Sequence, residues 1–367
     1  MRQTKCLFDE AKMTPEGMVS VSQLQTFLSC RKKWEYNYIL NIKPRVERSY
    51  LTIGKLCHRG MQVAMQELWA SGNDGKWNLA MSQGVRAIRE EYDEYICNTD
   101  LLDEEMPDME QMLHDAVRVF RQAFQEFEPW KYEVVTLCDK GKPIPALELH
   151  FVVPCAGTKG LHGYIDAILI DEETGFIWCT DYKFRKTLSP DEEEAYNIQN
   201  AVYSWACHKM NVPITGTMTW QHVNTPAADP AILKDGKISR AKIKTTWDHY
   251  REFCLEHGQD PENYYHEMEE KLRDIEFFRP TYEYRNMPTI KRMWNECVLP
   301  AARAVAKARN KKVKKYRSLY PWNCKMCQFQ SLCQAELRDY DADAIRSREY
   351  VKRTHAIIAK REEEGNG

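Results

Sequence analysis

Two neighbouring β-strands joined by a short turn are predicted by the stretch GYIDAILIDEETGFIWCTDYKFRK, residues 163–186. The first apolar run is interrupted only by Asp166, and the second ends in Asp181-Tyr-Lys183. The residues between them, Asp-Glu-Glu-Thr-Gly at 171–175, have the composition of a hairpin turn. A carboxylate inside an apolar strand costs free energy unless a charged group meets it. The two aspartates therefore restrict what can pack beside this hairpin.

The position of Lys183 suggests what that charged group is. It stands two residues after Asp181, so the two side chains share one face of the strand. Carboxylates on adjacent strands with a lysine beside them indicate a divalent cation and an anionic substrate, as in a phosphodiesterase. The alternative is a surface hairpin with an exposed Asp–Lys ion pair, because Asp-x-Lys is common by chance. This segment alone does not decide between them.

Two further segments carry residues that suit a metal site. His58 follows Gly54-Lys-Leu-Cys, which we expect to open a long amphipathic helix, with Gly54 allowing close backbone packing before it. Imidazole is a ligand for Mn²⁺ and tolerable for Mg²⁺, although a lone histidine is usually a packing or surface residue. Glu148 places another carboxylate in the predicted strand before the hairpin.

A Gln/Tyr pair lies on the helix predicted after the hairpin. Gln199 and Tyr203 are spaced i,i+4, so they share one helix face. We expect this helix to start with Ser189 as its N-cap, followed by Pro190 and acidic residues in the first turn.

The order and spacing of these residues resemble the RecB-like branch of the PD-(D/E)xK nucleases. That branch includes RecB, AddB, CRISPR-associated RecB-like nucleases and stand-alone phage exonucleases. The matching motifs are Gly54-x-x-x-His58, Glu148, Gly163-x-x-Asp166, Asp181-Tyr182-Lys183 and Gln199-x-x-x-Tyr203. The resemblance implies metal binding by His58, Asp166, Asp181 and the Tyr182 carbonyl. It also implies a catalytic group of Glu148, Lys183, Gln199 and Tyr203, in which Lys183 positions the attacking water or stabilises the phosphate.

The cysteines provide a second motif. Thirteen cysteines, without a signal peptide or an apolar run long enough for a membrane span, indicate a reducing cytoplasmic compartment. Most lie scattered in apolar contexts, as buried thiols do. Cys324, Cys327 and Cys333 differ, because Cys-x-x-Cys followed by a third cysteine has metal-ligand spacing. A fourth ligand is then needed, and Cys30 is the candidate.

This split of one early and three late cysteines resembles the RecB-like nucleases that carry an iron–sulfur cluster. The resemblance implies a [4Fe–4S] cluster that joins the two ends of the chain as a structural clasp. Zinc is the alternative and suits four thiolates equally well. Two features depart from the family pattern: Arg31 stands where a proline is usual, and nearly the whole chain separates Cys30 from Cys324.

A basic segment precedes the cysteine group. Residues 303–317 contain eight basic residues and no acid, although the net charge of the chain is −2. We expect a helix whose charge contacts backbone phosphates, the alternative being a solvated helical face. The predicted nucleic-acid-binding residues are Lys307, Arg309, Lys311, Lys312, Lys314, Lys315 and Arg317.

The expected fold class is α/β: a restriction-endonuclease-like core, which is a mixed β-sheet flanked by helices, with helical insertions and an Fe–S clasp joining the N- and C-terminal arms. A composition of 43% hydrophobic and 29% charged residues can bury a large core. Strands are expected over 132–183 and 216–223. The predicted parts are a helical arm with Cys30 (1–53), the nuclease core with a helical insertion near 70–130 (54–225), a helical insertion (226–290), the basic helix and cysteine group (291–338) and a charged tail (339–367).

These features together predict an enzyme that hydrolyses DNA phosphodiester bonds with one or two Mg²⁺ or Mn²⁺ ions. An exonuclease acting on linear ends or single strands in recombination, repair or replication is expected. The alternatives are a flap-type endonuclease and a non-cleaving DNA-binding subunit, against which intact Asp166, Asp181 and Lys183 argue. Without a Walker A motif or helicase signature, a helicase or recombinase would be a separate partner, and no membrane association is expected.

Overall fold

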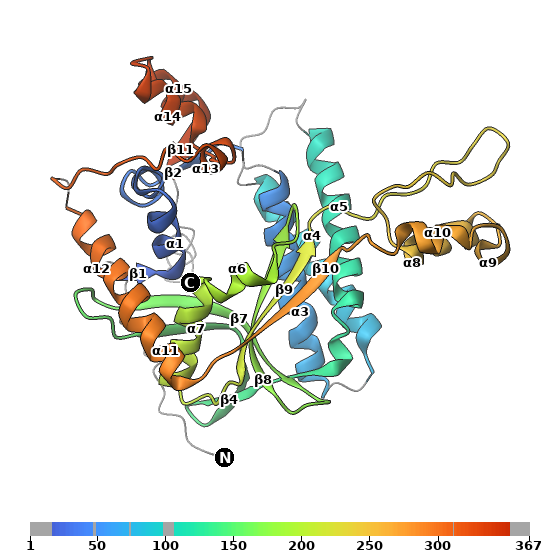
Figure 1. Ribbon diagram of the computed structural model, residues 1–367, viewed down its shortest axis with the longest axis horizontal. Helices are drawn as coiled ribbons and strands as arrows, with labels where there is room; N and C mark the ends of the chain where they lie inside the picture. The colour runs from blue at the N-terminus through green and yellow to red at the C-terminus, as the bar shows by residue number, and fades with distance from the viewer. Residues whose placement is uncertain (1–16, 47–48, 73–74, 98–105, 311, 353–367) are drawn as a thin grey trace, which may run out of the picture.

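A mixed β-sheet with helices on both faces forms the core of the computed structural model (Figure 1), which describes residues 17–46, 49–72, 75–97, 106–310 and 312–352. The sheet runs in the order β1, β7, β8, β9, β10, and β3 and β6 also pair with β7. Its strands are β1 (Val19–Ser20), β3 (Tyr132–Val134), β6 (Leu147–Val153), β7 (Leu161–Asp171), β8 (Ile177–Arg185), β9 (Gly216–Val223) and β10 (Phe278–Tyr284). This arrangement agrees with the predicted mixed sheet flanked by helices. No helix within the described residues is long and apolar enough to cross a membrane.

The hairpin predicted from the sequence is present as β7 and β8. The strands pair antiparallel from Ala167 opposite Thr180 to Ile170 opposite Ile177. In the turn, Asp171 Oδ1 accepts hydrogen bonds from the two backbone N–H groups that follow Glu172. Gly175 has a φ of 69°, a left-handed conformation that glycine adopts without strain. The strand predicted over 216–223 is confirmed as β9, which runs parallel to β8.

Three long helices cover one face of the sheet: α3 (Ser49–Ala70), α4 (Trp77–Cys97) and α5 (Met106–Glu126). Gly60 and Gly84 let them approach closely, because a Cβ at either position would lie within 2.8 Å of the Phe120 ring. The prediction that Gly54 precedes the helix is wrong, since α3 already begins at Ser49. Ile53 and Leu56 of α3 pack into the same core, so burial stabilises the N-terminal part of this helix.

The opposite face is covered by α1 (Val21–Ser29), α7 (Ile198–Lys209), α11 (Met287–Met293), η4 (Trp294–Val298) and α12 (Leu299–Ala308). The predicted start of the Gln199 helix at Ser189 is wrong. A separate short helix, α6 (Asp191–Ala195), follows Pro190, and α7 begins after Asn197, whose side chain accepts from the Gln199 N–H at 3.0 Å. Asn197 also donates to the buried Glu194 at 2.8 Å, so this polar contact separates the two helices.

The range predicted as a helical insertion, 226–290, is only partly helical. It contains α8 (Trp247–Glu256), α9 (Pro261–Tyr264) and α10 (Glu267–Leu272), which extend away from the sheet in Figure 1. The chain then returns as β10, which pairs antiparallel with β9 from Gly216 to His222. The sequence did not predict this strand because it contains Pro280. A proline is tolerated there because β10 is an edge strand, whose outer side forms no ladder hydrogen bonds.

The N- and C-terminal segments pack together at one end of the molecule. The elements are α2 (Arg31–Trp34), η1 (Glu35–Ile39), β2 (Ile42–Pro44), α13 (Pro321–Lys325), α14 (Gln330–Leu337), α15 (Ala342–Glu349) and β11 (Tyr350–Lys352). β2 and β11 pair antiparallel, and Tyr36, Phe329 and Tyr350 share a small core. The first half of the predicted charged tail therefore belongs to the fold, and residues 353–367 lie outside the described residues. A separate two-stranded ribbon is formed by β4 (Thr136–Asp139) and β5 (Lys142–Pro145).

The prediction that the basic segment forms one helix is wrong. α12 ends at Ala308, and residues 314–320 have no regular structure. The Asn310 side chain accepts from the Lys312 N–H at 2.9 Å, an alternative to the helical ladder. Like charges three and four residues apart also destabilise a helix.

Candidate active site

Three carboxylates lie in a row across β6, β7 and β8. In the β6–β7 ladder, Leu147 pairs with Ala167 and Leu149 pairs with Ile165. Glu148 therefore lies opposite Asp166. The β7–β8 ladder ends one residue before the level of Asp166 and Asp181. At this point the Tyr182 N–H donates to Asp166 Oδ2 at 2.8 Å, so a side-chain oxygen replaces the backbone carbonyl as its hydrogen-bond acceptor. Glu148 has a φ of 43°, a left-handed conformation that is uncommon outside glycine and is often found at functional sites.

His58 reaches this row from α3. Its Nδ1 lies 3.4 Å from Asp166 Oδ2, and the ring packs edge-on against Phe184 and Tyr182. One ligand atom from each of His58, Glu148 and Asp166 lies within 4.8 Å of the others. Across the described part of the chain, no other three His, Cys, Asp or Glu side chains meet that spacing.

The charge state of these residues suits a divalent cation. Burial, together with the nearby Asp166, raises the pKa of Glu148 to about 7. Burial likewise raises the pKa of Asp166, partly offset by Lys183. Burial and Lys183 hold the pKa of His58 at about 4, so its imidazole is neutral and can act as a ligand. Carboxylate oxygens and a neutral imidazole fit Mg²⁺ or Mn²⁺, and a bound cation would offset the repulsion between the acids.

Asp181 is held by a different set of contacts. Only 1% of the residue is exposed, and its two carboxylate oxygens lie 2.9 and 2.6 Å from Lys183 Nζ. Burial raises its pKa to about 6, against the influence of Lys183. Gln199 accepts from Lys183 at 3.1 Å through Oε1 and donates to Asp181 at 3.0 Å through Nε2. Tyr203 lies 2.6 Å from the same Nε2, so the polar chain continues along α7.

Every residue predicted for catalysis or metal binding therefore lies in or beside this one cluster. Tyr182 contributes its backbone, with the N–H on Asp166 and a main-chain hydrogen bond to His58. The three-ligand group contains Glu148, for which the sequence resemblance implied a catalytic role, whereas Asp181 pairs with Lys183.

Two residues at the cluster escaped sequence reasoning. Gln25 on α1 donates from Nε2 to Gln199 Oε1 at 3.1 Å. The positive charge of Arg59 lowers the pKa of Glu148. Nothing in the local pattern marks Gln25, because a polar residue on an amphipathic helix is ordinarily solvent-facing. Arg59 follows His58 directly, and that adjacency was the one available signal.

The four predicted cluster cysteines converge on one region: Cys30 caps α1, Cys324 lies on α13, Cys327 lies between α13 and α14, and Cys333 lies on α14. Cys30 Sγ accepts from the Ser318 N–H at 3.5 Å, and Cys324 Sγ donates to the Ser318 carbonyl at 3.5 Å. Burial raises the pKa of Cys327, and Cys30 and Cys333 raise it further, which places these three as neighbours. Arg317 donates to Cys333 Sγ at 3.2 Å.

The basic residues divide into two groups. Lys307, Lys312 and Lys314 are exposed. The others contact the protein: Arg309 the Met18 carbonyl and Gln23, Lys315 the Asn310 carbonyl, and Arg317 both Cys333 and Glu336. Lys311 lies outside the described residues.

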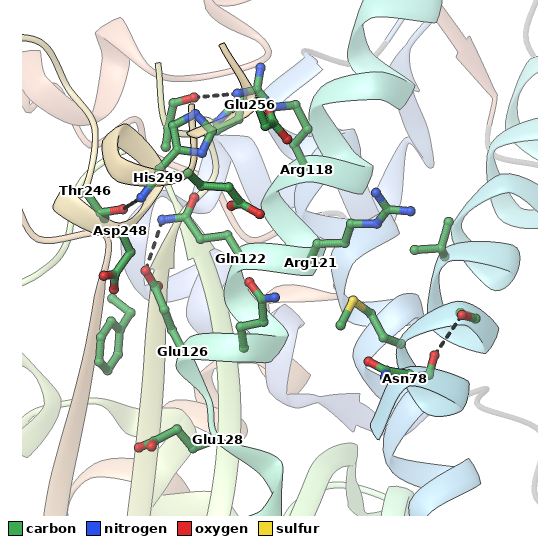
Figure 2. Close-up of a pocket in the computed structure, with 18 residues that line it drawn as sticks. Asn78, Arg118, Arg121, Gln122, Glu126, Glu128, Thr246, Asp248, His249 and Glu256 are labelled. Carbon is green, nitrogen blue, oxygen red and sulfur yellow. Dashed lines mark hydrogen bonds between the residues drawn. The ribbon is translucent and has the colours of Figure 1, made fainter. Parts of the chain in front are cut away.

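A cavity of about 870 Å³ lies between α4, α5 and the α8 region (Figure 2). Arg118, Gln122 and Glu126 project into it from α5, with His249 opposite. Its charges are partly paired, since Arg118 and His249 both contact Asp229, at 2.8 and 2.7 Å. The lining includes none of the predicted site residues, so this cavity is separate from the carboxylate row.

Comparison with known proteins agrees with the site geometry. No curated protein matches the chain at a significant level. The family model described as the PD-(D/E)XK nuclease superfamily matches residues 18–334, which include the carboxylate row, Lys183, the Gln199 helix and all four cluster cysteines. The chain therefore belongs to the PD-(D/E)XK nuclease superfamily.

Proposed function

We propose that this protein is a metal-dependent deoxyribonuclease that acts as an exonuclease on DNA ends. The observation that carries the proposal is the row of Glu148, Asp166 and Asp181 across three adjacent strands, with His58 and Lys183 beside it. This arrangement combines ligands for a hard cation with one positive side chain for a phosphate.

The residues would divide the chemistry between them. His58, Glu148 and Asp166 would hold the first cation, with Asp181 and the Tyr182 carbonyl as further ligands. One or two Mg²⁺ or Mn²⁺ ions there would lower the pKa of the attacking water and offset charge on the phosphate.

Lys183 is the residue suited to contact the substrate directly. Its side chain is 24% exposed, and Asp181 and Gln199 hold it in one direction. It can therefore orient the attacking water or donate to a phosphate oxygen. A further contact of Gln199, to Tyr203, helps to hold the Gln199 side chain in this position.

The cysteine set supports a [4Fe–4S] cluster in this proposal. The four thiols converge on one region, and their split into one early and three late cysteines resembles that of the iron–sulfur RecB-like nucleases. Zinc is the alternative, because it suits four thiolates equally well. The cluster would act as a clasp, because Cys30 and the later three cysteines come from opposite ends of the chain.

Action on ends is supported by the resemblance of the motifs to stand-alone phage exonucleases, and binding of the DNA backbone is supported by the exposed lysines beside the cysteine group. The sequence carries no Walker A motif, so unwinding of a duplex would fall to another protein.

Cleavage of end-labelled linear and closed circular DNA, with and without Mn²⁺, tests the proposal. We expect Mn²⁺-dependent loss of linear DNA while closed circles persist. Nicking of the closed circles would show that the protein is an endonuclease and would contradict the exonuclease assignment. Binding without any cleavage would overturn the enzyme assignment and leave a DNA-binding subunit.

A further inference from the structure

Large aromatic side chains stand exposed on the segment that leads into the cysteine group. Tyr320 is 61% exposed and Trp322 is 71% exposed, and Leu319 beside them is also exposed. Pro321 separates the two rings and begins α13. Rings of this size usually bury most of their surface, so adjacent exposed ones indicate a contact surface.

The segment is anchored on both sides of these rings. The Arg31 guanidinium lies 4.2 Å from the centre of the Tyr316 ring, which fixes the chain four residues before Tyr320. Ser318 lies between the sulfur atoms of Cys30 and Cys324, one from each terminal segment. The rings are therefore presented from a fixed base, as a stacking surface requires.

Positive charge lies on both sides of the aromatic residues. Lys312 and Lys314 precede them and Lys325 follows them, and all three side chains are exposed. Cationic residues that flank exposed aromatic ones suit a nucleic-acid strand, which offers phosphates for the cations and bases for the rings.

The segment is also close to the carboxylate cluster along α1. Gln25 on this helix contacts Gln199, and Cys30 caps the C-terminal end of the same helix. Five residues of α-helix span about 8 Å, so one short helix connects the two regions.

We propose that Tyr320 and Trp322 form a stacking platform that binds single-stranded DNA. This inference rests on the proposed nuclease function and specifies its substrate. Bases of a single strand offer free faces to the two rings, whereas bases inside a duplex are already stacked on each other. The lysines contact phosphates in either form, so discrimination in favour of the single strand comes from the aromatic pair.

Equilibrium binding by the full chain tests the platform, with a chelator of divalent cations present to prevent cleavage. The ligands are a fluorescein-labelled oligothymidylate and a blunt duplex of equal length. Replacing both rings, Tyr320→Ala with Trp322→Ala, should weaken single-strand binding at least about tenfold, because stacked bases lose both partners. Duplex binding should change less than about twofold, because the phosphate contacts remain. Tyr320→Phe with Trp322→Phe should retain single-strand binding.

Two further variants separate stacking from charge and from general surface effects. Tyr264→Ala removes a comparably exposed ring on α9 and should leave both affinities unchanged. Lys312→Ala with Lys314→Ala should weaken binding of both DNA forms. The same variant should also reduce the salt dependence of binding, by about one unit of slope for each lysine that neutralises a phosphate in the wild-type complex.

The stacking platform would be overturned if the double alanine variant binds single-stranded DNA as tightly as the wild type. The proposed nuclease function would still hold if the wild-type protein cleaves DNA. Equal losses of affinity for single strand and duplex would also overturn the platform. Wild-type protein that binds neither DNA form and cleaves neither would overturn the platform and the proposed function together.

Discussion

Gln25 on α1 donates a hydrogen bond to Gln199 on α7 at 3.1 Å, although 174 residues separate them in the chain. Gln199 in turn accepts from Lys183 and donates to Asp181. The helix α1, which Cys30 caps, therefore orients the polar side chains on which the proposed chemistry depends. This contact makes Gln25 a positioning residue, because it reaches the reacting groups only through Gln199.

Replacement of Gln25 by alanine should slow cleavage with little change in KM. Loss of one neutral hydrogen bond is worth about 1 kcal/mol, or about fivefold in rate. Steady-state cleavage of labelled DNA would measure kcat and KM separately, with Ser29→Ala on the exposed end of α1 as the control. A rise in KM at constant kcat would assign Gln25 to substrate binding instead.

Replacement of Asp166 or Asp181 by alanine should abolish cleavage and leave DNA binding largely intact. Asp181 is buried and Asp166 is half-buried, and burial raises the pKa of each, so their removal should not lower the melting temperature greatly. Mn²⁺-dependent cleavage of linear DNA is the measurement, with Glu173→Ala in the exposed turn as a matched control. Cleavage within about tenfold of wild type, a barrier change of about 1.4 kcal/mol, would contradict the metal site.

Replacement of His58 by alanine should weaken Mn²⁺ binding. The imidazole lies 3.4 Å from Asp166 and is neutral near pH 7, because its pKa is about 4. Titration calorimetry with Mn²⁺ would report the dissociation constant without requiring cleavage. His114→Ala removes an exposed imidazole from α5 and should leave Mn²⁺ affinity unchanged. Equal affinities for the His58 variant and wild type would make His58 a packing residue against Phe184.

Protein purified without oxygen should be brown and contain iron. Cys30→Ala should lose the visible absorption and loosen the packing of the N- and C-terminal segments, because ligand bonds supplement a small local core. Iron analysis and absorption spectra measure this, and Cys138→Ala, an exposed cysteine on β4, is the control. Colourless protein with one equivalent of zinc would keep the four-cysteine site and replace the cluster with zinc.

Local sequence patterns determined the hairpin of β7 and β8, the strand β9 and the shared face of Gln199 and Tyr203. Each depends on side-chain alternation or helical spacing within a few residues, which the backbone geometry imposes directly. The bounds of elements near polar residues and prolines were less predictable. The sequence did not indicate that α6 and α7 are separate helices on either side of Asn197, and Pro280 argued against a strand at β10.

Only the tertiary structure decided which residues meet. The strand registers set Glu148 beside Asp166, α3 carries His58 to the same point, and α1 brings Gln25 to Gln199. These contacts depend on how helices pack on the two faces of the sheet, and that packing is not encoded in any short window of sequence. The sequence determined which residue types could act as ligands and which face of its own helix or strand each one occupies. Bringing these residues together depended on the burial of apolar surface, which is non-directional and involves the whole chain.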